Sequence, residues 1–182
     1  MPEQSKKILL VNPPWIIGED KNLWKEVGSC WPSLGLAYIA AVLERAGHQV
    51  KYLDCSAEEL TVNDTVSKLK EYEENFDFIG LTATTPLINN ALAIAREAKV
   101  IFPKAKTVFG GVHPSILPDE VMARPEVDFV VIDEGEETMK ELVEGKNPAE
   151  ILGLCFKESG RIIKNQLRPL IKNLDDIPPP AY

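Results

Sequence analysis

The chain has 182 residues, 45% of them hydrophobic, which predicts a single domain with an ordinary packed core. Its formal net charge of −8 at pH 7 argues against a nucleic-acid partner, because nucleic-acid phosphates are bound by basic surfaces. The polar N-terminus MPEQSKK, apolar runs too short for a membrane span, and three dispersed cysteines (Cys30, Cys55 and Cys155) together indicate a cytoplasmic protein.

Strand-like and helix-like segments alternate along the chain. The first strand is continuously apolar, as expected of a strand that is buried on both faces of a sheet. Apolar residues recur at helical spacing in the helices, the clearest of which is ended by Pro103. In chain order the predicted elements are strand Lys7–Val11, a helix opened by Pro32 and Ser33 that runs to Ala46, strand Gln49–Leu53, helix Val62–Glu74 capped by Asn63 or Asp64, strand Phe76–Leu81, helix Asn89–Phe102, strand Thr107–Phe109, helix Leu117–Ala123, strand Val127–Ile132 and helix Gly135–Glu144.

Five strands joined through helices predict an α/β fold of the flavodoxin-like (Rossmann-like) kind, a doubly wound five-stranded parallel sheet. Right-handed crossovers favour the strand order 2-1-3-4-5, with a switch point between strands one and three. Ligands of such sheets bind at the carboxyl ends of the strands, where the loops meet. The fold therefore predicts where a site would lie.

Residues 151–182 differ in character from residues 1–150, which form the predicted domain. Leu154–Lys157 and Arg161–Lys164 predict a small C-terminal hairpin turned by Ser159-Gly160. The segment NQLRPLIKNLDDIPPPAY that follows is extended and rich in proline, which is typical of a stiff spacer between domains. We expect it to be a linker strap towards a further domain that this chain lacks.

Three segments, LVNPP, TATTP and GGVHP, each follow a predicted strand, so they would line one edge of the sheet. In TATTP, the hydroxyls of Thr82, Thr84 and Thr85 precede a helix, where free amides and the helix dipole favour an anionic group such as a phosphate. The same threonines also suit plain helix capping by Thr84 or Thr85. Both interpretations are open at this stage.

GGVHP begins with Gly110 and Gly111, which suit either a ligand that approaches the backbone closely or a sharp exit from the strand. His113 stands alone beside a proline, a setting more typical of packing or hydrogen bonding than of metal ligation. Gly35, near the start of its helix, costs roughly 1 kcal/mol relative to alanine in a helix interior, and a closely approaching ligand would explain it.

Four segments carry a family resemblance: WPSLGLAYIAAVLERAGHQV, IGLTATTPLINNAL, VFGGVHPSILPDEV and VDFVVIDEGEETMKEL. They resemble, in order and spacing, the N-terminal cobalamin-binding domain of cobalamin-dependent radical S-adenosylmethionine (SAM) enzymes. LRPLIKNLDDIPPPAY is similar to the strap that leads into the radical domain of that family. The resemblance covers roughly Lys7 to Tyr182.

The resemblance implies cobalamin as cofactor, with the TATTP and GGVHP loops around its nucleotide tail and the LGL segment near the corrin. Cobalamin proteins with a histidine on cobalt use D-x-H-x-x-G after the first strand, and the connection NPPWIIGEDKNLWKEVGSCWPSLG has no histidine. This implies a base-off state, with the benzimidazole displaced into a pocket and no protein histidine below cobalt. Trp15, Leu23, Trp24 and Trp31 would cover the lower face, or pack against the domain core or a neighbouring domain.

The family usually has an R-G-E-G-E-like stretch where this chain has Asp133 and Glu134 before Gly135, which leaves the contacts of this loop open. The helix dipole by itself explains acidic residues at this helix start. No residue is assigned a catalytic or metal-ligating role. The candidate cofactor-binding residues are Asn12, Pro13, Pro14, Ser33, Leu34, Gly35, Thr82, Ala83, Thr84, Thr85, Gly110, Gly111, Val112, His113, Pro114, Glu134, Gly135 and Glu136.

Catalysis in the family requires a C-x-x-x-C-x-x-C motif for a 4Fe-4S iron–sulfur cluster, and this chain has none. The resemblance implies a parent enzyme that adds a radical SAM domain, the cluster, S-adenosylmethionine and a small-molecule substrate. Its reaction would be methyl transfer to an unactivated carbon, or oxidative ring closure like that of the anaerobic magnesium-protoporphyrin monomethyl ester cyclase. The fragment alone is expected to be inactive.

Other classes that share the fold fit less well. A phosphorylation receiver needs an acidic pair after strand one, where this chain has Asn12 and Pro13, and a nicotinamide dehydrogenase needs G-x-G-x-x-G there. A flavin module would use the same edge of the sheet. A cofactor-free docking domain is the main alternative, and bulky residues at Gly110 and Gly111 would separate it from a binding domain.

Overall fold

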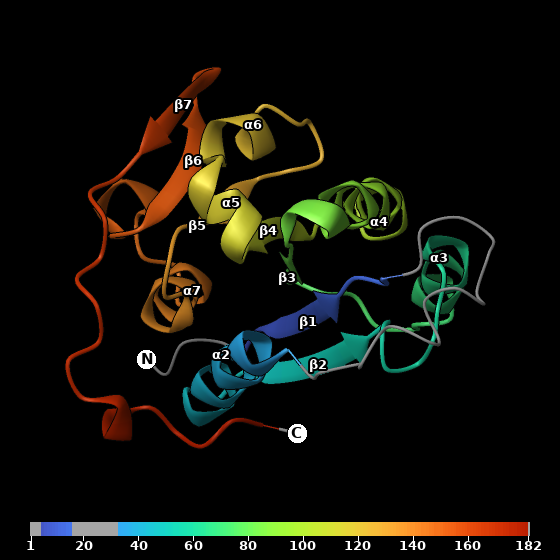
Figure 1. Ribbon diagram of the computed structural model, residues 1–182, viewed down its shortest axis with the longest axis horizontal. Helices are drawn as coiled ribbons and strands as arrows, with labels where there is room; N and C mark the ends of the chain where they lie inside the picture. Colours follow the sequence, from blue (N-terminus) through green and yellow to red (C-terminus); the bar gives the residue numbers. More distant parts are fainter. Residues whose placement is uncertain (1–4, 16–32, 182) are drawn as a thin grey trace.

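The computed structural model describes residues 5–15 and 33–181. Within these ranges the strands form one sheet of seven strands in the order β2-β1-β3-β4-β5-β6-β7 (Figure 1). The strands are β1 Lys7–Asn12, β2 Gln49–Asp54, β3 Phe78–Thr82, β4 Lys106–Gly110, β5 Phe129–Val131, β6 Leu154–Glu158 and β7 Arg161–Lys164. The first five pair in parallel, which confirms the predicted flavodoxin-like order 2-1-3-4-5.

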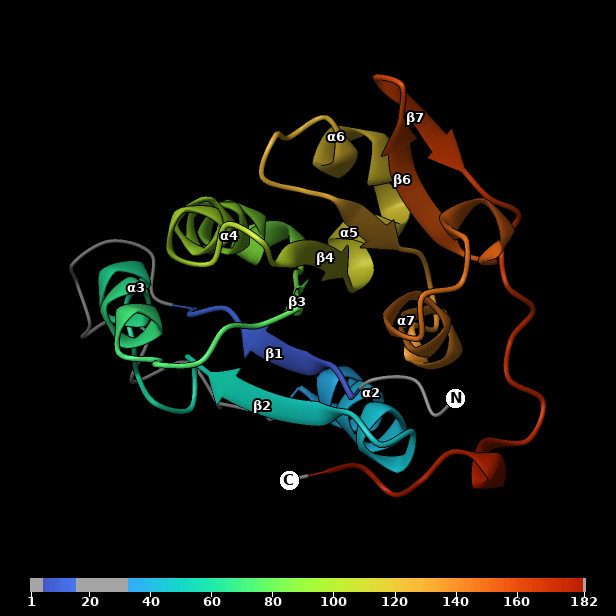
Figure 2. The ribbon, with the colours of Figure 1, turned by 180° about the vertical axis from the view of Figure 1, so that it is seen from behind.

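Helices cover both faces of the sheet. They are α2 Leu34–Arg45, α3 Val62–Lys70, α4 Ile88–Ile101, α5 Val112–Ile116, α6 Pro118–Met122 and α7 Glu136–Val143, with 3₁₀ turns at Thr85–Leu87, Pro148–Glu150 and Leu174–Asp176. Helices α2 and α7 pack together on one face, and α3 and α4 on the other (Figure 2). Over the described residues, every helix is too short or too polar to cross a membrane.

The core lies in two layers, and β1 contributes to both because successive side chains of a strand point to opposite faces. Leu9 and Val11 join the apolar cluster under α3 and α4, whereas Ile8 and Leu10 join the cluster under α2 and α7. None of the four side chains is more than 1% exposed. The continuously apolar sequence of this strand therefore reflects burial on both faces, as predicted.

The predicted C-terminal hairpin is present, and it extends the main sheet. β6 pairs antiparallel with β5, and β7 pairs antiparallel with β6. Cys155 on β6 is completely buried. The residues that follow run beside α7 and on to α2 (Figure 1). We call residues 165–181 the strap.

Local differences from the sequence prediction arise at helix ends. Helix α3 is capped by Thr61, which accepts a hydrogen bond from the backbone N–H of Asp64 while the Asp64 carboxylate accepts one from the N–H of Thr61. This capping box places the cap before Asn63, and the helix ends at Lys70 rather than at Glu74. Helix α5 begins directly after Gly111, where the sequence predicted a loop.

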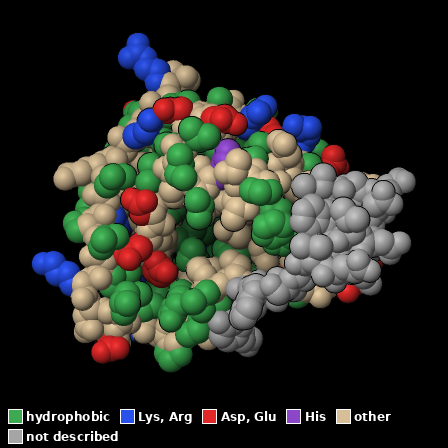
Figure 3. Space-filling view, viewed as in Figure 1, with side chains coloured by type: hydrophobic (Ala, Val, Ile, Leu, Met, Phe, Trp, Pro, Cys, Tyr) green, Lys and Arg blue, Asp and Glu red, His purple; other side chains and the backbone are tan. Residues whose placement is uncertain are grey.

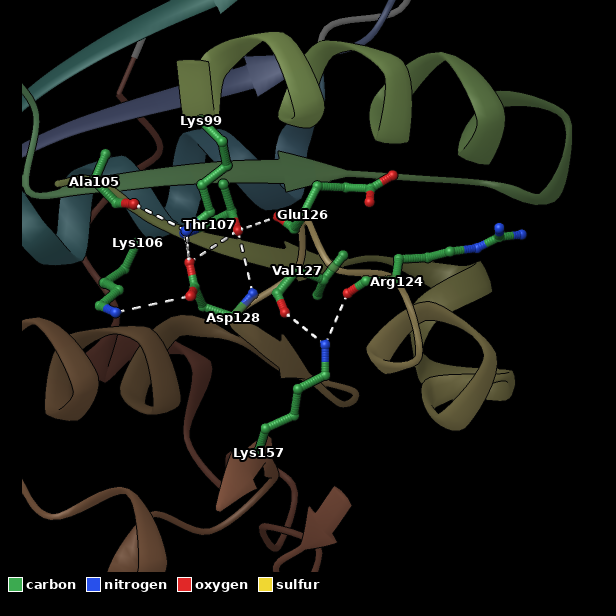
Figure 4. Close-up of polar contacts among 9 residues, drawn as sticks. All are labelled: Lys99, Ala105, Lys106, Thr107, Arg124, Glu126, Val127, Asp128 and Lys157. Atoms are coloured by element: carbon green, nitrogen blue, oxygen red, sulfur yellow. Dashed lines mark hydrogen bonds and ion pairs between the residues drawn. The ribbon is translucent and has the colours of Figure 1, made fainter. Parts of the chain in front are cut away.

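A polar network occupies the opposite edge of the sheet, at the amino ends of β4 and β5 (Figure 4). The Asp128 carboxylate accepts hydrogen bonds from the Thr107 backbone N–H at 2.8 Å and from the Lys99 ammonium, and Lys106 lies 3.8 Å away. The Thr107 hydroxyl donates to the Glu126 carbonyl at 2.5 Å. Burial raises the pKa of Asp128, but these donors outweigh it and hold that pKa below its usual value.

Candidate functional site

A pocket opens at the carboxyl ends of β1, β3, β4 and β5, between the sheet and helices α2 and α7. Its volume is about 160 Å³. Leu10, Val108 and Val131 from the strands, with Met139 from α7, give it an apolar lining. Figure 3 shows a hollow with hydrophobic side chains inside and acidic side chains beside it. The pocket therefore combines an apolar interior with an acidic rim.

Glycines make room for this pocket. A Cβ atom built on Gly80, in the middle of β3, would lie 2.8 Å from Cδ2 of Leu10, so a side chain there would displace the pocket lining. A Cβ atom on Gly110 would come no closer to another residue than 3.9 Å, from the Val131 carbonyl oxygen. A Cβ atom on Gly110 would thus meet only an ordinary van der Waals contact, which is compatible with the hypothesis of close ligand approach.

Gly111 has a different role. Its φ is +94°, a backbone conformation that glycine adopts without strain. A Cβ atom there would lie 2.6 Å from the Thr82 hydroxyl oxygen and 3.0 Å from the Ala83 carbonyl oxygen. Gly111 therefore fits the second interpretation, a sharp strand exit, and the two glycines serve different purposes.

The loops after β3 and β4 are joined by hydrogen bonds. The Ala83 N–H donates to the Gly110 carbonyl at 2.9 Å, and the His113 N–H donates to the Ala83 carbonyl at 3.1 Å. Nδ1 of His113 lies 3.2 Å from the Thr85 hydroxyl, and the His113 side chain is buried. His113 consequently ties the two loops together, in agreement with its interpretation as a hydrogen-bonding residue.

Two buried polar atoms of these loops have no hydrogen-bond partner among the described residues: the Thr84 hydroxyl and Nε2 of His113. Thr84 precedes the 3₁₀ turn, but its side chain makes no capping hydrogen bond. Plain helix capping therefore does not account for Thr84. Buried polar groups are almost always paired, so these two atoms are exceptions that the described residues do not explain.

The loop after β1 is held by its neighbours. The Asn12 amide donates to Asp54 at 2.9 Å, Ser56 donates to the Pro13 carbonyl at 2.9 Å, and Asn90 donates to the Pro14 carbonyl at 2.8 Å. These bonds attach the loop to the end of β2 and to α4. Trp15 is 45% exposed, whereas Leu23, Trp24 and Trp31 lie outside the described residues. The proposed apolar cover stays a prediction.

The acidic rim comes from the connection between β5 and α7. The Glu134 carboxylate accepts a hydrogen bond from the Ile171 backbone N–H of the strap at 2.7 Å. Oε2 of Glu136 is buried and has no partner among the described residues. Burial, reinforced by the carboxylates of Glu134 and Glu137, raises the pKa of Glu136.

Seven of the predicted site residues line the pocket: Gly35, Thr82, Gly110, Gly111, Glu134, Gly135 and Glu136. The other predicted residues are not part of its lining: Asn12, Pro13, Pro14, Ser33, Leu34, Ala83, Thr84, Thr85, Val112, His113 and Pro114. Sequence reasoning missed the rest of the lining, which is apolar apart from Asp133: Leu10, Leu36, Ile39, Gly80, Leu81, Val108, Phe109, Val131, Asp133 and Met139. Gly80 was the available signal, because an isolated glycine inside a strand often marks a close approach of another group.

The described residues contain no group of three or more histidine, cysteine, aspartate and glutamate side chains that would hold a metal ion. Their chemistry at the carboxyl edge is instead that of a receptor for an organic ligand. It offers an apolar slot, the Thr82 side chain in its lining, and unpaired buried polar atoms beside it. A parallel α/β sheet with such a pocket at this edge defines a Rossmann-like cofactor-binding domain.

The cofactor class follows from comparison with known families. The family model described as "B12 binding domain" matches residues 22–143, and the chain belongs to that family. It is 41% identical over 181 residues to an uncharacterized methyltransferase of Pyrococcus horikoshii, covering 97% of this chain and 38% of that protein. It is 29% identical over 182 residues to the anaerobic magnesium-protoporphyrin IX monomethyl ester cyclase of Cereibacter sphaeroides, covering 95% and 29%.

Solved structures share the fold. OxsB, a cobalamin-dependent S-adenosylmethionine radical enzyme with aqua-cobalamin and S-adenosylmethionine bound, superposes with a TM-score of 0.79 at 19% identity, covering 98% of this chain and 24% of that one. The radical S-adenosylmethionine methyltransferase TsrM from Kitasatospora setae, with cobalamin and a 4Fe-4S cluster bound, gives 0.72 at 22% identity, covering 97% and 31%. The predicted relationship to cobalamin-dependent radical SAM enzymes is therefore confirmed. The chain spans less than two fifths of the length of these relatives.

Proposed function

We propose that this chain binds cobalamin in a base-off state, with the benzimidazole base displaced into the pocket at the carboxyl edge of the sheet. The observation that carries the proposal is the apolar slot lined by Leu10, Val108 and Val131 and kept open by Gly80 and Gly110. A cavity of about 150 Å³ accepts a benzene-sized ring, so about 160 Å³ suits a planar aromatic base and not the corrin macrocycle.

The remainder of the cofactor would then lie outside the slot. Leu34 and Gly35 at the start of α2 are exposed at its mouth, and no atom lies within 4 Å of a Cβ built on Gly35, so a flat macrocycle has room there. The hydroxyls of Thr82, at the end of β3, and of Thr84 and Thr85, in the loop that follows, would hold the phosphate and ribose of the tail. The unpaired Thr84 hydroxyl supports this assignment.

No protein histidine is proposed below cobalt. The connection between β1 and α2 contains no histidine, and the only histidines of the chain are His48 and His113. His48 accepts from the Lys6 backbone N–H at 3.2 Å, and His113 bonds to Thr85, so both rings have local roles. The role of this chain's residues is accordingly to bind and orient the cofactor, while cobalt supplies the methyl-transfer or redox chemistry.

The parent enzyme is proposed to be a cobalamin-dependent radical SAM methyltransferase or cyclase. In this organisation residues 1–150 bind cobalamin, and residues 151–182 provide the hairpin and the strap towards a radical SAM domain. That domain would carry the 4Fe-4S cluster, S-adenosylmethionine and the small-molecule substrate. Support comes from the methyltransferase and cyclase relatives, of which this chain matches only a part.

Reconstitution tests the proposal. The chain, and a longer version that continues through the downstream domain, are mixed with hydroxocobalamin, desalted, and examined by visible and cob(II)alamin paramagnetic resonance spectroscopy. We expect retained corrin bands without nitrogen superhyperfine splitting from a lower ligand. Nitrogen splitting would refute the base-off, histidine-off state. Two colourless proteins would refute cobalamin binding and leave the docking domain, and a yellow protein with an isoalloxazine spectrum would indicate a flavin module.

A further inference from the structure

Glu136 is the polar group of the pocket that the proposed function leaves unexplained. It lines the slot together with Gly135 and Met139 of the same segment. Its Oε2 atom is shielded from solvent and has no hydrogen-bond partner among the described residues. Leaving a buried carboxyl oxygen without a hydrogen bond is destabilising, so a partner supplied by the ligand would favour binding.

The surroundings of Glu136 favour its protonated form. Desolvation raises its pKa most, and the carboxylates of Glu134 and Glu137 raise it further. The backbone N–H groups of Glu136 and Gly135 lower it, but the net effect is a pKa above the usual value. Asp133 adds another acidic group to the same lining, and among the described lining residues there is no lysine, arginine or histidine. The facing residues of α2, which include Leu36 and Ile39, are apolar.

The nearby cations are paired elsewhere. Lys140, on the same helix, lies 3.6 Å from Glu137, and Arg168 of the strap bonds to Glu141 and to Thr138. Glu134 receives the Ile171 N–H. Oε2 of Glu136 is thus left without a partner among the described residues, so a proton on this oxygen would be free to be donated to a ligand.

We propose that Glu136 recognises the base of the nucleotide tail by donating its carboxyl proton, in a hydrogen bond, to the imidazole-type nitrogen that is freed when the base leaves cobalt. This assignment rests on the proposed base-off binding and makes Glu136 a specificity-determining residue of that site. An aromatic base with an unprotonated ring nitrogen satisfies the acid. A phenolic base without that nitrogen leaves the acid unpaired.

The test measures dissociation constants of hydroxocobalamin for the wild type, Glu136→Gln, Glu136→Leu and the control Glu137→Gln, from about pH 4 to about pH 8. Gln keeps a donor at every pH, because its amide does not ionise. The ratio of wild-type to Glu136→Gln affinity removes the pH effects that the two proteins share. We expect this ratio to fall about tenfold as pH rises through the raised pKa of Glu136, since the ionised carboxylate loses its donor and repels the nitrogen lone pair.

Glu136→Leu is measured with cobalamin and with a cobamide that carries a phenolic base. We expect about tenfold weaker binding of cobalamin at low pH and no loss for the phenolic cobamide. Glu137→Gln should keep the pH dependence, displaced slightly to lower pH because one repelling carboxylate is gone. The assignment is overturned if the ratio of wild-type to Glu136→Gln affinity does not change with pH. It is also overturned if Glu136→Leu weakens the binding of both cobamides equally. In either case cobalamin binding itself stands. Wild-type protein that binds no cobamide overturns the proposed function itself.

Discussion

At the scale of single residues, the two adjacent glycines at the end of β4 differ in role, one in ligand binding and the other in folding. Gly110 faces the pocket with space around its Cα, whereas Gly111 has a positive φ and packs against the Thr82 and Ala83 loop. A side chain at the first position would therefore enter the ligand's space. A side chain at the second would strain the backbone.

We predict that Gly110→Leu folds with a free energy of unfolding within about 1 kcal/mol of the wild type, yet fails to retain cobalamin, because the new side chain occupies the slot. Gly111→Ala should instead lose roughly 1–3 kcal/mol of stability through its close contacts and its positive φ. Urea unfolding and the corrin absorbance after desalting measure the two effects. Retained cofactor in a folded Gly110→Leu variant would contradict the proposed position of the base.

At the scale of elements, the strap connects the hairpin to both helices that wall the pocket. Nε of Arg168 donates to the Thr138 hydroxyl at 2.9 Å, and its guanidinium pairs with Glu141 of α7. Further along, Arg45 of α2 donates to the Asp176 carbonyl at 2.9 Å. The extended segment predicted as a linker is thus ordered against the domain over much of its length.

We predict that Arg168→Ala lowers the free energy of unfolding by about 1 kcal/mol, since the ion pair is partly buried and is discounted for solvent screening. The Ile171 amide should also exchange with solvent faster, because the strap is then held less firmly beside Glu134. Hydrogen exchange followed by mass spectrometry measures this. Lys172→Ala, an exposed strap position, is the control, and equal exchange in Arg168→Ala and the wild type would show that Arg168 does not hold the strap.

Helices and strands with a clear local sequence pattern could be predicted from the sequence. Pairings between strands that are distant in the sequence were harder to predict. The alternation of strands and helices, together with right-handed crossovers, favoured the order 2-1-3-4-5 that the parallel strands adopt. The pairing of β6 with β5 depends on contacts between residues 129–131 and 154–156, which no local pattern encodes. Helix α5 was missed because its sequence, VHPSI, has a proline and is too short to show periodicity.

The same limit applies to the site. Gly110 and Gly111 were recognisable as a pair, but only the structure shows room for a Cβ atom at Gly110 and a tight strand exit at Gly111. The apolar lining escaped notice because Leu10 and Val108 are indistinguishable in sequence from core residues. Glu136 was explained by the helix dipole, whereas its unpaired buried oxygen is visible only in three dimensions.

At the scale of the whole molecule, the two edges of the sheet have different tasks. The carboxyl edge holds the pocket, with unpaired polar atoms and an apolar slot. The amino edge holds the network around Asp128, where the buried Thr107 side chain and the carboxylate are both hydrogen-bonded (Figure 4). Stability and ligand binding should therefore respond separately to substitutions at the two edges.

We predict that Asp128→Asn lowers the free energy of unfolding at neutral pH by about 1–3 kcal/mol, because Asn replaces a carboxylate that accepts from Lys99 and from the Thr107 N–H. Cobalamin affinity should stay unchanged, since the pocket lies at the other edge. Urea unfolding and cobalamin titration of the same samples measure both, with the exposed Glu120→Gln as the control. A parallel loss of affinity and stability would show that the edges are coupled.

The pH dependence of this difference follows from the lowered pKa of Asp128. A carboxyl group whose pKa is lower in the folded than in the unfolded chain contributes its full stability above the unfolded pKa. That contribution disappears as the pH falls through the folded pKa, where the carboxyl is protonated in both states. The stability gap between wild type and Asp128→Asn should consequently be constant near neutrality and shrink in acid below the usual aspartate value of 3.8. If the stability difference between wild type and Asp128→Asn widened on acidification, the pKa of Asp128 would not be lowered in the folded chain. That result would contradict the stabilising effect of the donors that surround the carboxylate.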